Sequence, residues 1–142
     1  MSDDISSLKH LGKPKTELNY DEPSADILDT FANPYPDREY TIQFVTGEFT
    51  SLCPVTGQPD FATIEINYIP NKLCIESKSL KLYLLAYRQH GSFAETITNQ
   101  ILQDLVQACA PAWMEVKAGF VARGGIRMNL RAVHQGSSVK NQ

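Results

Sequence analysis

Cysteine is scarce in this sequence, and the three residues of this type, Cys53, Cys74 and Cys109, are widely spaced. An odd number at such spacing predicts neither a disulfide framework nor a CxxC pair, and it favours a reducing, cytoplasmic environment. No apolar stretch approaches the roughly 20 residues that a membrane-spanning helix needs. The first segment, MSDDISSLKH, is polar and acidic, unlike a secretion signal.

Long basic runs and the common cofactor and metal motifs are absent as well. The formal net charge is −3 and the pI is about 5.5, whereas a nucleic-acid-binding protein normally presents a basic face. HExxH, P-loop and GxGxxG motifs do not occur, so a dinucleotide would bind outside a Rossmann fold. The three histidines lack metal-ligand spacing. We therefore expect no nucleic-acid, membrane or metal partner.

The sequence does contain enough apolar residues for one domain with a real core. Its 142 residues are 42% hydrophobic and 20% charged, which is typical of a globular protein. Residues 1–38 are rich in Pro, Asp, Asn and Ser and predict an irregular arm. Residues 39–135 carry regular apolar patterns, and residues 136–142 predict a frayed tail.

Alternation of apolar and polar residues predicts four strands. Such period-two patterns indicate half-buried antiparallel strands. They occupy the ranges 40–46, 62–68, 114–120 and 126–132. The segment 72–75 is compatible with a further short strand, and the two glycines at 124–125 predict a turn between the last two strands.

Helical spacing of apolar residues predicts two helices between the second and third strands. The first covers 77–87. The second opens with SFAE at 92–95, which matches a capping box, and carries apolar residues at intervals of four from Phe93 to Cys109 before Pro111. The order ββααββ predicts an α+β fold in which two helices cover one face of an antiparallel sheet. Unprotected sheet edges predict assembly through those edges.

The segment LCPVTGQPDF, residues 52–61, places a cysteine in a turn between two strands. A free cysteine is often a small buried residue, and Cys74 and Cys109 are interpreted in that way because they lie in apolar periodic segments. The turn instead favours an accessible thiol at Cys53, as a nucleophile requires. Because a nearby carboxylate raises the pKa of a thiol, Asp60 is interpreted as a proton carrier rather than as the activator of Cys53.

Several charged residues allow two interpretations each. Lys78 and Lys81, within ESKSLKLY, are either a solvated helix face or a cationic pair for phosphate oxygens, to which Arg123 could contribute. Glu95 is either the capping carboxylate of the second helix or an acceptor for the paired N–H donors of a guanine-like base. His90 either orients another group or satisfies a loop. The residues alone leave these alternatives open.

Four motifs taken together resemble the short, single-domain 7-cyano-7-deazaguanine reductases, the NADPH-dependent nitrile reductases of queuosine biosynthesis. They are LCPVTGQPDF, ESKSLKLY, RQHGSFAE and ARGGI, in that order between about residues 40 and 132. ESKSLKLY matches the family pattern E-[SL]-K-[SA]-x-K-[LY]-[YFW] at every defined position. The resemblance implies the tunnelling fold, in which ββααββ units join into a multi-subunit barrel, commonly as pentameric rings stacked in pairs into a decamer.

The resemblance also implies roles for individual residues. Cys53 would be the nucleophile that forms a thioimidate with the nitrile, and Asp60 would be the proton donor. The implied contacts to the base come from Ile75, Glu76, Ser77, Ala94 and Glu95, and those to the phosphates of NADPH come from Lys78, Lys81 and Arg123. Many family members have histidine where this chain has Ala94, so this chain lacks that imidazole beside Glu95.

The implied reaction reduces the nitrile of 7-cyano-7-deazaguanine to a primary amine with two NADPH, as a step towards queuosine in tRNA. Three alternatives to this reaction exist. A cyclohydrolase of the same fold would need zinc held by Cys and His, a ligand set that the sequence does not show. A transferase acting on a related base would keep Cys53 and Asp60 without the NADPH motif. A non-catalytic base-binding ring protein would keep working with Cys53 replaced by alanine.

Overall fold

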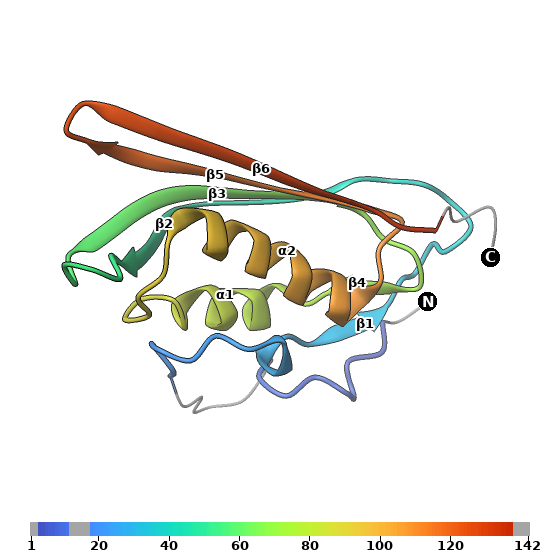
Figure 1. Cartoon of the computed structure of the whole chain (residues 1–142). Coiled ribbons are helices and arrows are strands. Elements are labelled where there is room, and N and C mark those ends of the chain that lie inside the picture. Colours follow the sequence, from blue (N-terminus) through green and yellow to red (C-terminus); the bar gives the residue numbers. More distant parts are fainter. Residues whose placement is uncertain (1–2, 12–17, 138–142) are drawn as a thin grey trace.

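A four-stranded antiparallel sheet forms one layer of the molecule, and two helices form the other (Figure 1). The computed structural model describes residues 3–11 and 18–137. The sheet has the order β2-β3-β5-β6, with β2 (Ile42–Leu52), β3 (Pro59–Ile69), β5 (Trp113–Arg123) and β6 (Ile126–Gln135). Helices α1 (Ser77–Leu85) and α2 (Ala94–Cys109) lie on the same face. The predicted ββααββ order and the α+β class are confirmed.

The β2–β3 hairpin extends further than the alternating pattern predicted. Backbone pairing continues through Ser51 with Asp60 and through Leu52 with Pro59, after a register shift inside β2. Such a bulge bends a strand and increases its twist. Asp60 is therefore the second residue of β3 and lies on a paired strand, just beyond the loop that joins β2 to β3. Its side chain faces the same side of the sheet as that of Ser51, because directly paired residues share a face.

The N-terminal arm packs against the rest of the chain through a second, smaller sheet. Strand β4 (Leu73–Ile75) pairs with β1 (Thr30–Ala32), which follows a 3-10 helix, η1 (Ala25–Ile27). The arm predicted as irregular over 1–38 thus contributes a strand, whose partner lies far along the chain. Residues 1–2 and 12–17 of the arm and 138–142 of the predicted tail lie outside the described residues.

Apolar side chains from the sheet and both helices fill the space between the two layers. The α2 stripe from Ile97 to Cys109 is buried, as predicted. The hydroxyl of Tyr83 donates to Oδ2 of Asp104 at 2.6 Å and lies 2.8 Å from that of Tyr87. These buried hydroxyls are therefore satisfied, which stabilises the packing of α1 against α2. The well-packed core fixes the ends of the strands, where the site residues lie.

Helix α2 begins at Ala94, one residue after the position that the sequence pattern indicated. Phe93 is the N-cap residue and no side chain caps the helix, so the capping-box prediction for 92–95 is wrong. The preceding residue is held by the sheet instead, because the N–H of Ser92 donates to the Leu52 carbonyl at 3.2 Å. Phe93, predicted as part of the buried stripe, is 60% exposed. The start of α2 is therefore tied to the end of β2.

Candidate active site

The loop between β2 and β3 presents Cys53 at one end of the sheet. The N–H of Cys53 donates to the Gln58 carbonyl at 2.8 Å, and the N–H of Gly57 donates to the Cys53 carbonyl at 2.9 Å. Gly57 has a φ of 73°, a conformation that glycine adopts without steric cost. These bonds close a tight loop in which the thiol is partly exposed. Cys53 thus lies in a turn, as the sequence predicted.

The environment of this thiol favours the thiolate. Hydrogen bonding from the Thr56 hydroxyl, helped by the N–H groups of Thr56 and Val55 and by the Arg123 guanidinium, lowers the pKa of Cys53 to about 7, while partial burial opposes the shift. Burial has the opposite effect on the other two thiols. It raises the pKa of Cys74 and raises that of Cys109 to about 12. Of the three thiols, Cys53 is the one suited to nucleophilic attack near neutral pH.

Asp60 forms an ion pair within the same end of the sheet. Its Oδ1 lies 2.9 Å from Nη1 of Arg123, the last residue of β5. The Arg123 Nη2 donates to Oε1 of Gln58 at 3.1 Å. Ser51 on β2 pairs directly with Asp60 on β3. The Ser51 Oγ is buried and has no hydrogen-bond partner among the described residues. Thiol, carboxylate and guanidinium therefore belong to one group, to which Ser51 adds an unpaired hydroxyl.

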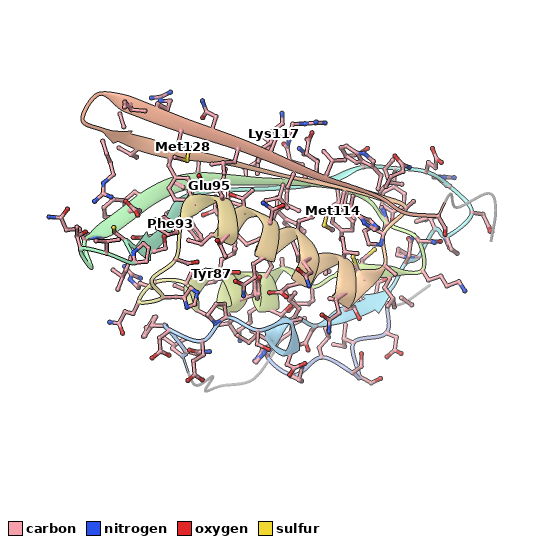
Figure 2. All side chains as sticks on the ribbon, in the orientation of Figure 1. Tyr87, Phe93, Glu95, Met114, Lys117 and Met128 are labelled. Carbon is pink, nitrogen blue, oxygen red and sulfur yellow. The ribbon has the colours of Figure 1, made fainter. Side chains whose placement is uncertain are left out.

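Glu95 and Phe93 lie at the start of α2, beneath the strands (Figure 2). Because no capping box forms, the Glu95 carboxylate has no intrahelical capping role and is exposed. The hydrogen bond between Ser92 and Leu52 holds this helix start beside the Cys53 loop. An exposed aromatic ring can stack on a planar base, and an exposed carboxylate at the same helix start can accept hydrogen bonds from it. Sequence reasoning missed Phe93 because it fitted the apolar stripe of α2.

The junction of β4 and α1 holds the other residues that the resemblance assigned to the base. Glu76 is buried and is the N-cap of α1, where its carboxylate accepts from the N–H groups of Lys78 at 2.7 Å and Ser79 at 2.9 Å. The Ile75 N–H donates to the Tyr68 hydroxyl at 2.9 Å. The Ile75 N–H and the Glu76 carboxylate therefore already make hydrogen bonds within the single chain. Neither was predicted from the sequence to have such a structural role.

A cavity of about 450 Å³ lies between α1 and strand β2. Its lining is largely apolar, and its polar members are Thr46, Glu48 and Thr50 of β2, Ser77 and Lys81 of α1, and Arg88 from the turn that follows. Lys81 and Arg88 are exposed, so their charges face the cavity rim and solvent. Along β2 the cavity reaches Thr50, close in the chain to Cys53. Arg88 was not predicted, since a single arginine after a helix has no distinguishing pattern.

The predicted site residues therefore fall into separate groups in the single chain. Cys53, Asp60 and Arg123 lie together, with Ala94 and Glu95 on the adjoining helix start. Ser77 and Lys81 line the cavity, and Lys78 donates from its Nζ to the His10 carbonyl at 2.8 Å. The remaining predicted residues are buried at the β4–α1 junction.

Within the part of the chain that the structure describes, no helix is long and apolar enough to cross a membrane.

The ββααββ layers, with a thiol-bearing loop at one end of the sheet, place this chain among proteins of the tunnelling fold. Comparison with known proteins agrees. A family model described as QueF-like protein matches residues 59–138. The solved apo structure of the archaeosine synthase QueF-Like is similar in fold, with a TM-score of 0.63 at 20% identity, over 68% of this chain and 94% of that one.

Curated relatives are more similar in sequence. One from Nitratidesulfovibrio vulgaris strain DP4 is 50% identical over 131 residues, which is 92% of this chain and 79% of the relative. One from Streptococcus mutans is 51% identical over 127 residues, which is 89% of this chain and 78% of the relative. Both are named NADPH-dependent 7-cyano-7-deazaguanine reductase. The chain belongs to the QueF-like family.

Proposed function

We propose that this protein is an NADPH-dependent oxidoreductase that reduces the nitrile of 7-cyano-7-deazaguanine to the primary amine, 7-aminomethyl-7-deazaguanine, in queuosine biosynthesis. The observation that carries the proposal is the loop thiol of Cys53, with a pKa of about 7, at the same sheet end as Asp60. The names of relatives at about 50% identity supply the substrate and the cofactor. A thiolate and an acid are the two groups that addition to a nitrile requires.

The first step joins Cys53 to the substrate. The thiolate sulfur adds to the nitrile carbon, and Asp60 delivers a proton to the nitrile nitrogen, which gives a neutral thioimidate. After hydride addition to that carbon, the C–S bond breaks and the sulfur leaves as thiolate, so an imine remains. A second hydride and further protons complete the amine. Ala94 has no proton to give, so proton delivery falls to Asp60.

The residues around the cavity fit the cofactor that the relatives' names state. When bound, NADPH supplies the hydride in both reductions, so each nitrile consumes two NADPH. Lys81 extends an exposed ammonium group at the rim of the cavity, and such a point charge suits phosphate oxygens. Lys78 and Arg123 are the further cofactor contacts that the resemblance implies. Their present partners are the His10 carbonyl and Asp60.

Recognition of the base is assigned to Glu95 and the residues near it. A carboxylate that takes no part in capping can accept two N–H groups from the pyrimidine edge of a deazaguanine. The exposed ring of Phe93 offers a face for stacking. Ile75, Glu76 and Ser77 would contribute from the β4–α1 junction, where the Ser77 side chain is exposed.

The division of these residues between two regions of the chain supports a site shared by neighbouring subunits. Strands β2 and β6 are the edges of the main sheet in the described residues. Edge-to-edge pairing of copies would bring the α1–β2 cavity of one chain towards the β6 edge of the next. We propose pentameric rings stacked as a decamer for this assembly.

The experiment is to follow the NADPH absorbance band with purified protein, with and without 7-cyano-7-deazaguanine. We expect oxidation that depends on the nitrile and approaches two NADPH per nitrile. The matched control is Cys53→Ala, which keeps the pocket and removes the nucleophile, so it should form no covalent adduct and oxidise no NADPH. An adduct on Cys53 without NADPH oxidation would favour a transferase, whereas the absence of any adduct would overturn the nucleophile assignment.

A further inference from the structure

The first described part of the N-terminal arm, residues 3–11, contacts the start of α1. Figure 1 shows the arm on the side of the two helices that faces away from the four-stranded sheet. Leu8 is buried, so its side chain anchors this segment to the rest of the chain. Two residues further on, the His10 carbonyl accepts a hydrogen bond from the Lys78 ammonium at 2.8 Å. The arm thus contacts a residue that the resemblance assigned to the cofactor phosphates.

Asp29 holds the same segment of the arm through its side chain. Its carboxylate is buried, and Oδ2 accepts the backbone N–H of Lys9 at 2.7 Å. Its Oδ1 lies 3.5 Å from the Lys9 ammonium. A buried charge is costly unless it is paired and hydrogen-bonded, and Lys9 supplies both kinds of contact. The position of Lys9, and with it that of the next residue, His10, is therefore set by Asp29.

The backbone of Asp29 is bonded to the first turn of α1. Its carbonyl accepts the Glu76 N–H at 3.0 Å, and its N–H donates to the Ser79 Oγ at 2.9 Å. The Ser79 hydroxyl donates in turn to the Glu76 carbonyl at 2.8 Å. Asp29 therefore connects the arm, through its side chain, with the helix start, through its backbone. A change of the Asp29 side chain loosens the arm and keeps the backbone contacts to α1.

Lys78 lies beside the proposed cofactor region. Lys78 and Lys81 are three positions apart on α1, so their side chains are neighbours on the helix surface, and Lys81 lines the α1–β2 cavity. An ammonium group has three donors, of which the His10 carbonyl takes one from Lys78. A long side chain loses rotamer freedom when it binds a ligand. A lysine that is already held in place loses less of it and binds more tightly.

We propose that Asp29 is a positioning residue of the cofactor site. Its carboxylate holds the arm at Lys9, and the arm orients the Lys78 ammonium through the His10 carbonyl. The inference rests on the proposed function, because it takes the phosphates of NADPH as the ligand of Lys78. In the opposite arrangement, the arm would compete with the phosphates for this ammonium group. Loosening the arm weakens NADPH binding if the arm positions Lys78, and strengthens it if the arm competes.

The test is a double-mutant cycle of Asp29→Asn and Lys78→Met, in which calorimetry measures the NADPH affinity of the free protein without nitrile. Asp29→Asn keeps the side-chain volume and removes the charge that binds Lys9. We expect this change to weaken NADPH binding about three- to tenfold. It should have no further effect in the Lys78→Met background, because the ammonium that it positions is absent there. Ile5→Ala, at an exposed position of the same arm, is the matched control and should bind NADPH like wild type.

Hydrogen exchange follows the arm itself, without any ligand. We expect faster exchange in the peptide that contains Lys9 in Asp29→Asn, with the core of α1 still protected. Leu8→Ser, which removes the apolar anchor of the arm, is the second variant and should have the same effects on exchange and on NADPH binding. Thermal melts check that each variant is folded.

Three results would overturn the inference alone. They are an unchanged or higher NADPH affinity in Asp29→Asn, an equal loss of affinity in the Lys78→Met background, and unchanged exchange of the arm. A merely structural role of Asp29 predicts the second of these results, because general destabilisation does not depend on Lys78. Wild-type protein that binds no NADPH would instead contradict the proposed function, and the inference would fall with it.

Discussion

The three thiols of the chain lie in different environments and should differ in reactivity. Cys53 is partly exposed with a pKa of about 7, whereas Cys74 and Cys109 are buried with raised pKa values. Since the thiolate is the reactive form, alkylation of Cys53 should rise with pH and reach half its maximum near pH 7. Peptide mass spectrometry after short exposure to iodoacetamide identifies the modified residue.

The same experiment contains its own controls. Cys53→Ser should leave almost no fast labelling in the native protein, and denaturant should expose Cys74 and Cys109 to the reagent. Fast labelling of Cys74 or Cys109 in the native state would contradict the burial described above. A Cys53 midpoint near 9 would show that the Thr56 hydroxyl and the neighbouring N–H groups do not stabilise the thiolate, since 9.0 is the ordinary value for a thiol.

Ser51 should be replaceable without loss of stability. Its hydroxyl is buried and has no hydrogen-bond partner among the described residues, so Ser51→Ala removes an unsatisfied polar group. We expect the free energy of unfolding to stay equal or to rise by about 1 kcal/mol. Urea titration of the two proteins measures this difference.

The neighbouring Thr50 gives a matched comparison for Ser51. Its hydroxyl donates to the Asp60 carbonyl at 2.8 Å, so Thr50→Val keeps the shape and removes a hydrogen bond that is made. This variant should lose about 1 kcal/mol. If Ser51→Ala is the more damaging of the two, then the Ser51 hydroxyl has a partner and our description of it is incorrect.

At the scale of the element, α1 depends on its N-cap. The Glu76 carboxylate satisfies two N–H groups of the first helical turn and lies at the positive end of the helix. Glu76→Ala should lower the free energy of unfolding by about 1–2 kcal/mol, with the loss visible in thermal or urea unfolding.

Ser77→Ala is the control for this prediction, because Ser77 is the exposed neighbour in the same helix start. It should change stability by less than about 0.5 kcal/mol. If Glu76→Ala left stability unchanged and only weakened substrate binding, the structural role of Glu76 would be excluded. A combined loss of stability and binding would indicate that capping α1 also shapes the base pocket.

The whole molecule presents apolar side chains that a lone chain leaves uncovered. Large exposed apolar residues of the strands are Val45, Phe61, Val121, Ile126, Met128 and Val133. Met128 is 41% exposed on β6, an edge strand, and Figure 2 shows it on the β5–β6 hairpin, inward from the turn that joins the two strands. Uncovered apolar surface at sheet edges is typical of surfaces that associate.

We therefore expect light scattering to give a mass near ten times 15.9 kDa for the wild-type protein. Met128→Glu should shift the population towards smaller species, because a charge buried in an interface costs several kcal/mol. Asn129→Glu is the control on the opposite face of β6 and should have a smaller effect. A monodisperse monomer of the wild-type chain would rule out the proposed ring.

The periodic segments were predictable because their signals are local. Alternation along β3 and the four-residue spacing along α2 depend on which face of the element is buried. Residues close together in the chain are enough to show such a spacing. The turn position of Cys53 followed from glycine and proline close by in the chain. The ββααββ order was predictable for the same reason, because each of its elements has its own local pattern.

The sequence by itself therefore determined the class of fold and the loop that carries the thiol. Only the tertiary structure decided that β4 pairs with β1, that Glu95 takes no part in capping, and that Arg123 binds Asp60. The physical reason is the same in each case. A hydrogen bond or ion pair between residues distant in the chain depends on where whole elements pack, and no local pattern of residue types records that placement.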